Sequence, residues 1–151
     1  MDADQYRKLL SMSDFAFIAE LDGEIAGFLL ALREGRPYDN GNYRWFTSHL
    51  KNFLYIDRVV VDEAKRGIGL GRSLYAQLFT WSVARQIRQV AAEIDIEPPN
   101  PISLTFHDRH GFVELGTRIL DNGKRVSMQV KTLESEEAET NTTQAQQDGG
   151  G

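Results

Sequence analysis

Cysteine is absent from the 151-residue sequence, so the chain forms no disulfide and has no thiolate for catalysis or zinc binding. Only three histidines are present, and His107 and His110 lie close together without a partner motif, which argues against a histidine-built metal site. The apolar runs are far shorter than the roughly 20 residues of a membrane-spanning helix. Residues 1–4 do not resemble a secretory signal. These absences predict a metal-free cytoplasmic protein with no membrane partner.

The excess of negative charge is confined to the C-terminal end. The formal net charge is −5, but every Lys and Arg lies at or before Lys131. The acids that follow it are Glu134, Glu136, Glu137, Glu139 and Asp148. Residues 134–151 also lack large apolar side chains, which predicts a disordered polar tail after one domain over residues 1–133. The remaining chain is close to neutral, so we predict no nucleic-acid partner.

Apolar periodicity and turn residues predict an α+β fold with a mixed, mainly antiparallel sheet flanked by helices. The expected elements are helices over 5–11, 73–85 and a short stretch after Asn100, strands over 15–21, 25–32, 55–61 and 90–96, and a hairpin over 112–130. Asp22-Gly23 is a two-residue hairpin turn, and 121–123 is a second turn signal. Residues 33–52 are expected to be irregular.

A glycine-rich run stands where the strand over 55–61 gives way to a helix. Its residues are Arg66, Gly67, Ile68, Gly69, Leu70, Gly71 and Arg72. The first helical turn has unpaired amides and a partial positive charge, and glycines let an anion approach the backbone closely. The run lacks the Lys of a Walker loop and the spacing of a dinucleotide fingerprint. It predicts a diphosphate-binding loop for a nucleotide-containing cofactor.

A second motif runs from Asn100 to Phe112. Asn100 suits a helix N-cap, and Gly111 suits the position just after a helix. Asn100, Ser103 and His107 fall on one helical face. The two motifs, in this order, resemble those of the GNAT superfamily of N-acetyltransferases, and the resemblance covers roughly residues 15–130.

The resemblance implies a GNAT-like acyl-CoA N-acyltransferase fold and acetyl-CoA as the co-substrate. The diphosphate is expected on the amides of residues 66–72, and the pantetheine arm on the backbone of Val59, Val60 and Val61, with their side chains in the core. Asn100, Ser103 and His107 are expected on the cofactor side. The implied activity is acetyl transfer to an amine of a small molecule or peptide; the alternative is an acyl-CoA-binding module with little catalysis. A homodimer stays open.

By the same resemblance, His107 occupies the place of the family's usual tyrosine, which protonates the departing thiolate; a polar surface residue is the alternative. The base is left open among Asp57, Glu93, Asp95 and ordered water. The alternating acids of the strand Glu93–Glu97 face one side, a pattern also typical of a solvated edge strand. Asp57, inside a strand pattern, is alternatively an ion-pair partner of an arginine such as Arg58.

Only fourteen residues precede Phe15, which is too few for the strand and helices that usually open this fold and wall the acceptor site. We therefore expect a shortened N-terminal part. The aromatic run Tyr43, Trp45 and Phe46 has two interpretations: packing in the core, which is favoured, or lining of the acceptor pocket.

Overall fold

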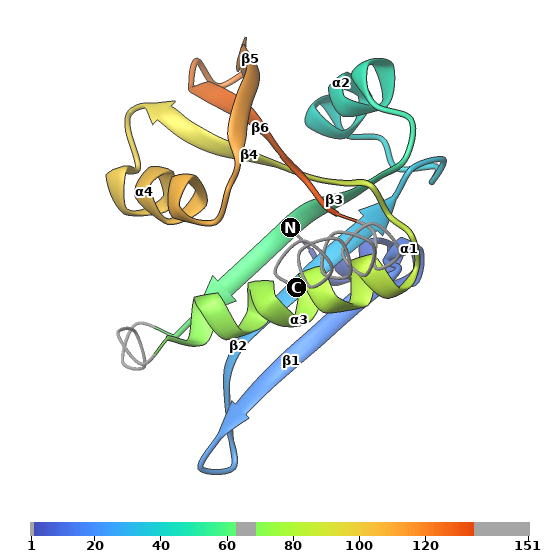
Figure 1. Ribbon diagram of the computed structural model, residues 1–151, viewed down its shortest axis with the longest axis vertical. Coiled ribbons are helices and arrows are strands. Elements are labelled where there is room, and N and C mark those ends of the chain that lie inside the picture. The colour runs from blue at the N-terminus through green and yellow to red at the C-terminus, as the bar shows by residue number, and fades with distance from the viewer. Residues whose placement is uncertain (1, 63–68, 135–151) are drawn as a thin grey trace, which may run out of the picture.

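The computed structural model describes residues 2–62 and 69–134 and contains one six-stranded sheet. Its elements are α1 (Ala3–Met12), β1 (Phe15–Leu21), β2 (Glu24–Arg33), α2 (Gly41–His49), β3 (Phe53–Val61), α3 (Leu70–Ala84), β4 (Gln89–Glu97), α4 (Pro101–Arg109), β5 (Val113–Ile119) and β6 (Arg125–Thr132). The strand order is β1-β2-β3-β4-β6-β5, and only β3 and β4 pair in parallel (Figure 1). The predicted mixed, mainly antiparallel α+β fold is therefore confirmed.

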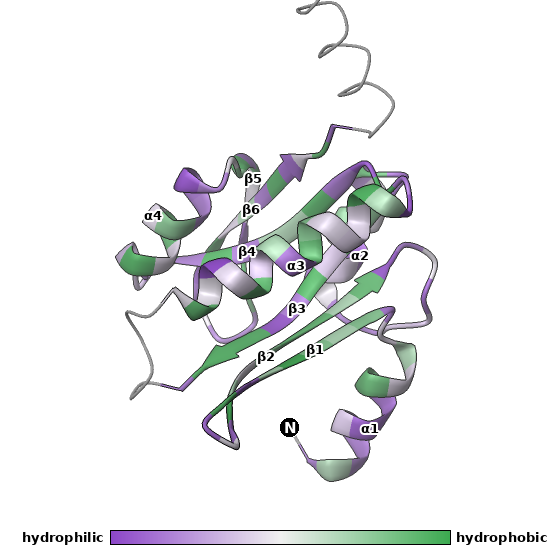
Figure 2. Cartoon of the chain, turned by 60° about the horizontal axis from the view of Figure 1, so that its bottom comes forward, coloured by the Kyte–Doolittle hydropathy of each residue, from purple (hydrophilic) through white to green (hydrophobic). Residues whose placement is uncertain are grey.

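Each face of the sheet carries its own apolar core. On one face α3 buries Leu74 and Leu78 against the strands, and Phe106 of α4 packs against the same cluster. On the other face α1 and α2 contribute Leu9 and Phe46. Because both faces are covered, the central strands are apolar along most of their length, as Figure 2 shows in green.

Helix α2 corrects the prediction of an irregular segment over residues 33–52. Asn40 caps the helix by accepting a hydrogen bond from the Tyr43 amide at 3.0 Å. Tyr43 and Phe46 are buried, so the core interpretation of the aromatic run holds for these two residues. The helix spans only nine residues and follows a stretch rich in turn residues, which concealed it from the sequence pattern.

The predicted turns and caps are confirmed. Asp22 and Gly23 both have positive φ, as a tight hairpin requires. The Asn100 side chain caps α4 by accepting from the Ser103 amide at 3.2 Å, and Gly111 follows the helix with a φ of 87°. The prediction of a disordered tail over residues 134–151 lies, except for Glu134, outside the described residues.

Helix α2 docks on β5 through a close approach of Trp45 to Gly116, where an added Cβ would lie 2.8 Å from a ring carbon. We expect Gly116→Ala to lower the free energy of unfolding by about 1–3 kcal/mol, because the indole must move out of its packed position. Denaturant unfolding measures this cost. In a Trp45→Leu background the same substitution should cost much less, and Thr117→Ala, on the exposed side of β5, is the control. An equal loss in both backgrounds would contradict this contact.

Candidate active site

The site is organised by the divergence of β3 and β4. The two strands pair only from Phe53 to Tyr55 on β3 and from Gln89 to Ala91 on β4, although each is nine residues long. Figure 1 shows them separating beyond this point. Asp57 is an extra residue in the β2–β3 ladder, because the register shifts between the flanking pairs. Such a bulge bends its strand and increases its twist, which turns the end of β3 away from β4.

The divergence leaves one backbone edge of Val59, Val60 and Val61 without a strand partner among the described residues, since these residues pair only with β2. Val59 is 38 % exposed and Val60 is 45 % exposed. The expectation that these side chains lie in the core is therefore wrong for Val59 and Val60, because no strand or helix covers the end of β3 there in the described structure. An unpaired edge of this kind accepts an extended ligand by backbone hydrogen bonds.

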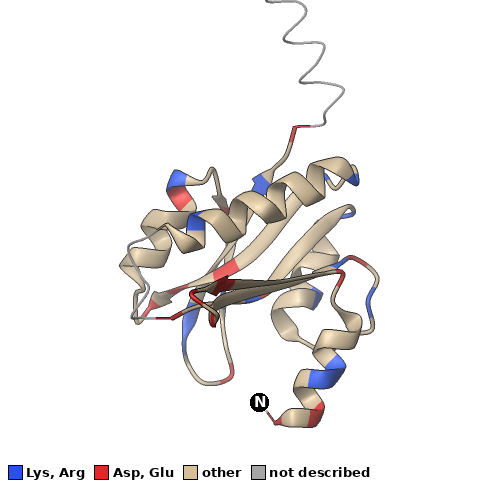
Figure 3. Cartoon of the chain, turned by 90° about the horizontal axis from the view of Figure 1, so that it is seen from below, with Lys and Arg blue, Asp and Glu red and all other residues tan. Residues whose placement is uncertain are grey.

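Helix α3 begins next to this edge, three residues earlier than the sequence pattern indicated. Gly69 is its N-cap, with a φ of 80° and no side-chain capping bond. The first backbone bond within the described helix comes from the Ser73 amide, so the amides of Leu70, Gly71 and Arg72 have no helical acceptor. Arg72 is the one charged residue of α3, and Figure 3 shows the rest of the helix uncharged. The described part of the loop thus suits an anion, whereas Arg66, Gly67 and Ile68 lie outside the described residues.

His107 is buried between α4 and α3 and is only 5 % exposed, so the interpretation as a surface residue is wrong. Its Nδ1 lies 2.7 Å from the Ser103 carbonyl oxygen, which only accepts, so Nδ1 carries a hydrogen. Its Nε2 therefore accepts the Tyr75 hydroxyl at 2.7 Å. Burial lowers the pKa of His107, which favours this neutral tautomer. Tyr75 was not predicted, because its place on the inner face of α3 is also typical of a core residue.

Glu93 lies on the opposite face of the sheet from His107 and is partly buried. The Tyr55 hydroxyl donates to its carboxylate, with oxygen–oxygen distances of 2.9 and 2.8 Å. Burial raises the pKa of Glu93 to about 7, against the lowering effect of hydrogen bonds from Tyr55 and Asn42. The solvated-edge interpretation is wrong here, because β4 lies between β3 and β6 and α2 contributes Asn42 beside the carboxylate.

Asp57 lies on the same face, at the bulge. It accepts the Tyr38 hydroxyl at 2.6 Å, and Arg58 Nε lies 3.7 Å from it, so the expected arginine partner is present. Burial raises the pKa of Asp57, more than Tyr38 and Arg58 lower it. The negative charge of Asp57 also raises the pKa of Glu93, so the structure brings these two candidates into one electrostatic site. No pattern in the sequence indicated Tyr38 or Tyr55 as their partners.

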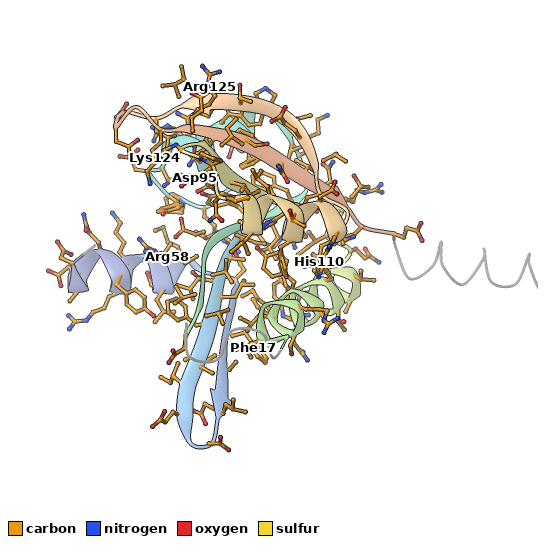
Figure 4. The ribbon with its side chains drawn as sticks, turned by 90° about the vertical axis from the view of Figure 1, so that its left-hand side faces the viewer. Phe17, Arg58, Asp95, His110, Lys124 and Arg125 are labelled. Carbon is orange, nitrogen blue, oxygen red and sulfur yellow. The ribbon has the colours of Figure 1, made fainter. Side chains whose placement is uncertain are left out.

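Asp95 is separate from this pair. It faces Lys124 at 3.6 Å, and the neighbouring Glu97 faces Arg125 at 3.3 Å. Figure 4 shows Asp95 and Lys124 together, away from Arg58. Because its carboxylate is paired with a lysine and lies apart from Asp57 and Glu93, Asp95 is the weaker candidate for proton abstraction.

Comparison with known families agrees with this architecture. The model of the acetyltransferase (GNAT) family matches residues 1–112. The chain belongs to the GNAT acetyltransferase family. No curated protein sequence matches it closely enough to be called a relative.

Several solved structures share the GNAT fold with this chain. The ribosomal-protein-S18-alanine N-acetyltransferase of Escherichia coli has a TM-score of 0.67 at 14% identity, covering 88% of this chain and 77% of that one. The ribosomal-protein-alanine N-acetyltransferase of Brucella melitensis has a TM-score of 0.66 at 22% identity, covering 88% of this chain and 80% of that one. A third structure is a provisionally assigned streptothricin acetyltransferase of Bacillus anthracis, solved with acetyl coenzyme A. It has a TM-score of 0.62 at 21% identity, covering 83% of this chain and 68% of that one. At these identities the likeness shows the fold alone.

No group of three or more His, Cys, Asp or Glu side chains able to hold a metal ion occurs within residues 2–62 and 69–134. In the same described parts, no helix is both long and apolar enough to cross a membrane. The absence of a metal, the cytoplasmic location and the homodimer stay predictions.

The buried bond between Tyr75 and His107 yields a stability test. We expect Tyr75→Phe to lower the free energy of unfolding by about 1–2 kcal/mol, because Nε2 of His107 loses its donor. In a His107→Leu background the same change should cost much less, since no acceptor is left for the hydroxyl. The pKa of His107 in the folded state lies below 6.5, its ordinary value, so the unfolded chain takes up the proton more readily. The contribution of neutral His107 to the free energy of unfolding should therefore be lost as the pH falls below 6.5. Denaturant unfolding at pH 8 and pH 5 measures both effects, and an equal cost of Tyr75→Phe in both backgrounds contradicts the pairing.

Proposed function

We propose that this GNAT-family protein is an acetyl-CoA-dependent N-acetyltransferase that transfers an acetyl group to a primary amine. The observation that carries the proposal is the pair of buried carboxylates, Asp57 and Glu93, beside the point where β3 and β4 diverge. A base with a pKa near the working pH is what an amine acceptor needs. The alternative, an acyl-CoA-binding module with little catalysis, gives no reason to place Glu93 where its side-chain partners in the described structure are the neutral groups of Tyr55 and Asn42.

The cofactor is proposed to bind on the α3 and α4 side. The unpaired edge of Val59–Val61 would hold the pantetheine arm, and the amides at the start of α3, with Gly69, would hold the diphosphate. Asn100, Ser103 and His107 stay candidates for this side of the site. Acetyl-CoA supplies the acetyl group and leaves as its thiol.

The chain's own task is to deliver a neutral amine. As the amine nitrogen bonds to the acetyl carbon, the carbon–sulfur bond breaks. The nitrogen gives up one proton and the sulfur takes up one. We propose Glu93 as the acceptor of the amine proton, with Asp57 beside it as the second candidate. Tyr55 and Asn42 hold the carboxylate in place, and neither removes its basicity in the way that a cation would.

The structure sets a condition on His107 as the proton donor to the thiolate. A charged His107 is required for the predicted role, and burial with a bond from Tyr75 opposes that charge. The two roles therefore predict opposite pH dependence. A base at Glu93 makes turnover rise with pH, whereas an imidazolium at His107 makes it fall.

The cofactor assignment predicts that acetyl-CoA raises the melting temperature of the wild-type protein, because it binds the folded state alone. Gly69→Asp should abolish this rise, since a carboxylate would stand where the diphosphate is expected. Gly35→Asp is the matched control: Gly35 has the same φ of 80° with open space around it, and it follows β2 at the opposite end of the sheet. The measurement is the melting temperature with and without millimolar acetyl-CoA. A wild-type rise in melting temperature in Gly69→Asp would exclude this loop as the diphosphate site.

The base assignment predicts that kcat/KM rises with pH through about 7 and then levels off, because the Glu93 carboxylate must be ionised to accept the proton. Glu93→Gln should lower kcat by roughly 10²- to 10⁴-fold and leave the acetyl-CoA-induced melting shift intact. Glu97→Gln, the same change on the same strand, is the control. Thiol release with the amine well below its KM, followed across pH, measures the kcat/KM profile, and saturating amine gives kcat for the variants. A wild-type rate in Glu93→Gln assigns the base to another group.

A further inference from the structure

We infer that the acceptor is an α-amino acid bearing a free carboxylate, and that Arg58 is the residue that binds this carboxylate. The inference rests on the proposed transfer to an amine and names the class of that amine. It is carried by the placement of Arg58 in a cavity next to the carboxylate pair, with most of its guanidinium unpaired.

Arg58 follows the bulged Asp57 directly on β3. It lines a cavity of about 350 Å³ together with Asp2, Ala3 and Tyr6 of the α1 segment and Phe28 of β2. Figure 4 shows Arg58 where the sheet meets α1. The cavity therefore opens on the α1 face of the sheet, the face that also holds Asp57 and Glu93.

The guanidinium of Arg58 has little to bind in the described structure. Its one ion pair there joins Nε to Asp57 at 3.7 Å, which is beyond hydrogen-bond distance. The two terminal nitrogens have no acceptor among residues 2–62 and 69–134. A planar fork of this kind matches a carboxylate in two parallel hydrogen bonds. Asp2, which lines the same cavity, uses its carboxylate to cap α1 by accepting from the Gln5 amide at 2.8 Å.

An α-amino acid carries its amine and its carboxylate on one carbon atom. The chain presents groups complementary to both at successive positions: Asp57 for the amine, and Arg58 for the carboxylate. Glu93 is held by Tyr55, which lies three residues before Arg58 on the same strand. The rings of Phe28 and Tyr6 give the cavity apolar walls, which suit an apolar or aromatic side chain.

Other classes of amine fit this arrangement less well. A diamine or an aminoglycoside would bring a second positive charge toward Arg58. A peptide N-terminus has a neutral amide where the amino acid has its carboxylate, so the guanidinium would lose water without gaining an anion. The cation in the cavity thus favours a zwitterion over a polycation or a peptide.

The test measures kcat/KM for three acceptors with the wild-type protein and with each variant. The acceptors are L-phenylalanine, L-phenylalaninamide and 1,5-diaminopentane. We expect wild type to prefer the amino acid over its amide by at least tenfold in kcat/KM. Arg58→Gln should lower kcat/KM for the amino acid by roughly 10- to 100-fold, mainly through KM, and leave the amide within about threefold. Arg58→Lys should recover part of the loss. Arg7→Gln, an exposed arginine of α1, is the control.

The ratio between the amino acid and its amide is the decisive readout. Arg58 also lowers the pKa of Asp57, so its removal changes the turnover of every acceptor, and this common effect cancels in the ratio. A ratio that does not change in Arg58→Gln overturns the inference, while turnover of the amide or the diamine still supports the proposed transferase. No turnover of any of the three amines by wild type, with acetyl-CoA bound, counts against both.

Discussion

The short parallel pairing of β3 with β4 is the constraint on which the rest of the site depends. Three residue pairs hold the strands together, and the bulge at Asp57 then turns β3 away. This one irregularity frees a backbone edge on Val59–Val61, brings that edge to the start of α3, and places Asp57 and Arg58 on the α1 face. A regular ladder continued through these positions would pair the edge with β4 and remove the opening between the two faces.

The two faces of the sheet divide the proposed chemistry. The α3 and α4 side offers free amides at the start of α3, with Arg72 in its first turn, which suit the phosphate end of a cofactor. The α1 and α2 side holds the two candidate bases, Asp57 and Glu93, above a core rich in aromatic residues. These two environments meet where β3 and β4 diverge. The reaction proposed for this GNAT-family protein needs both, because the acetyl donor and the amine must approach from different directions.

The sequence predicted the elements that local chemistry determines. Asn100, Gly111 and the Asp22-Gly23 turn act through their own backbone, so their positions follow from residue type. Helix α2 was missed because nine residues among turn formers carry no long period, and its stability comes from the burial of Tyr43 and Phe46. The candidate bases could be proposed from their residue type and their place in a strand, but their burial and hydrogen bonds depend on tertiary contacts. Nothing near Glu93 in the chain indicates that Tyr55 of the neighbouring strand donates to it.

The choice of tyrosines as partners of the buried acids has a chemical consequence. A lysine or arginine at hydrogen-bond distance would satisfy Glu93 and Asp57, but it would hold their pKa values low and leave weak bases. Tyrosine hydroxyls satisfy the same oxygens with a neutral donor, so burial still raises both pKa values. The fold accepts a cost in stability for this, because Glu93 must ionise in a poorly solvated place as the pH rises toward 7. This loss of stability is consistent with a residue that has to take up a proton during the reaction. Arg58, whose Nε lies 3.7 Å from Asp57, is beyond hydrogen-bond distance and can bind the carboxylate of a ligand.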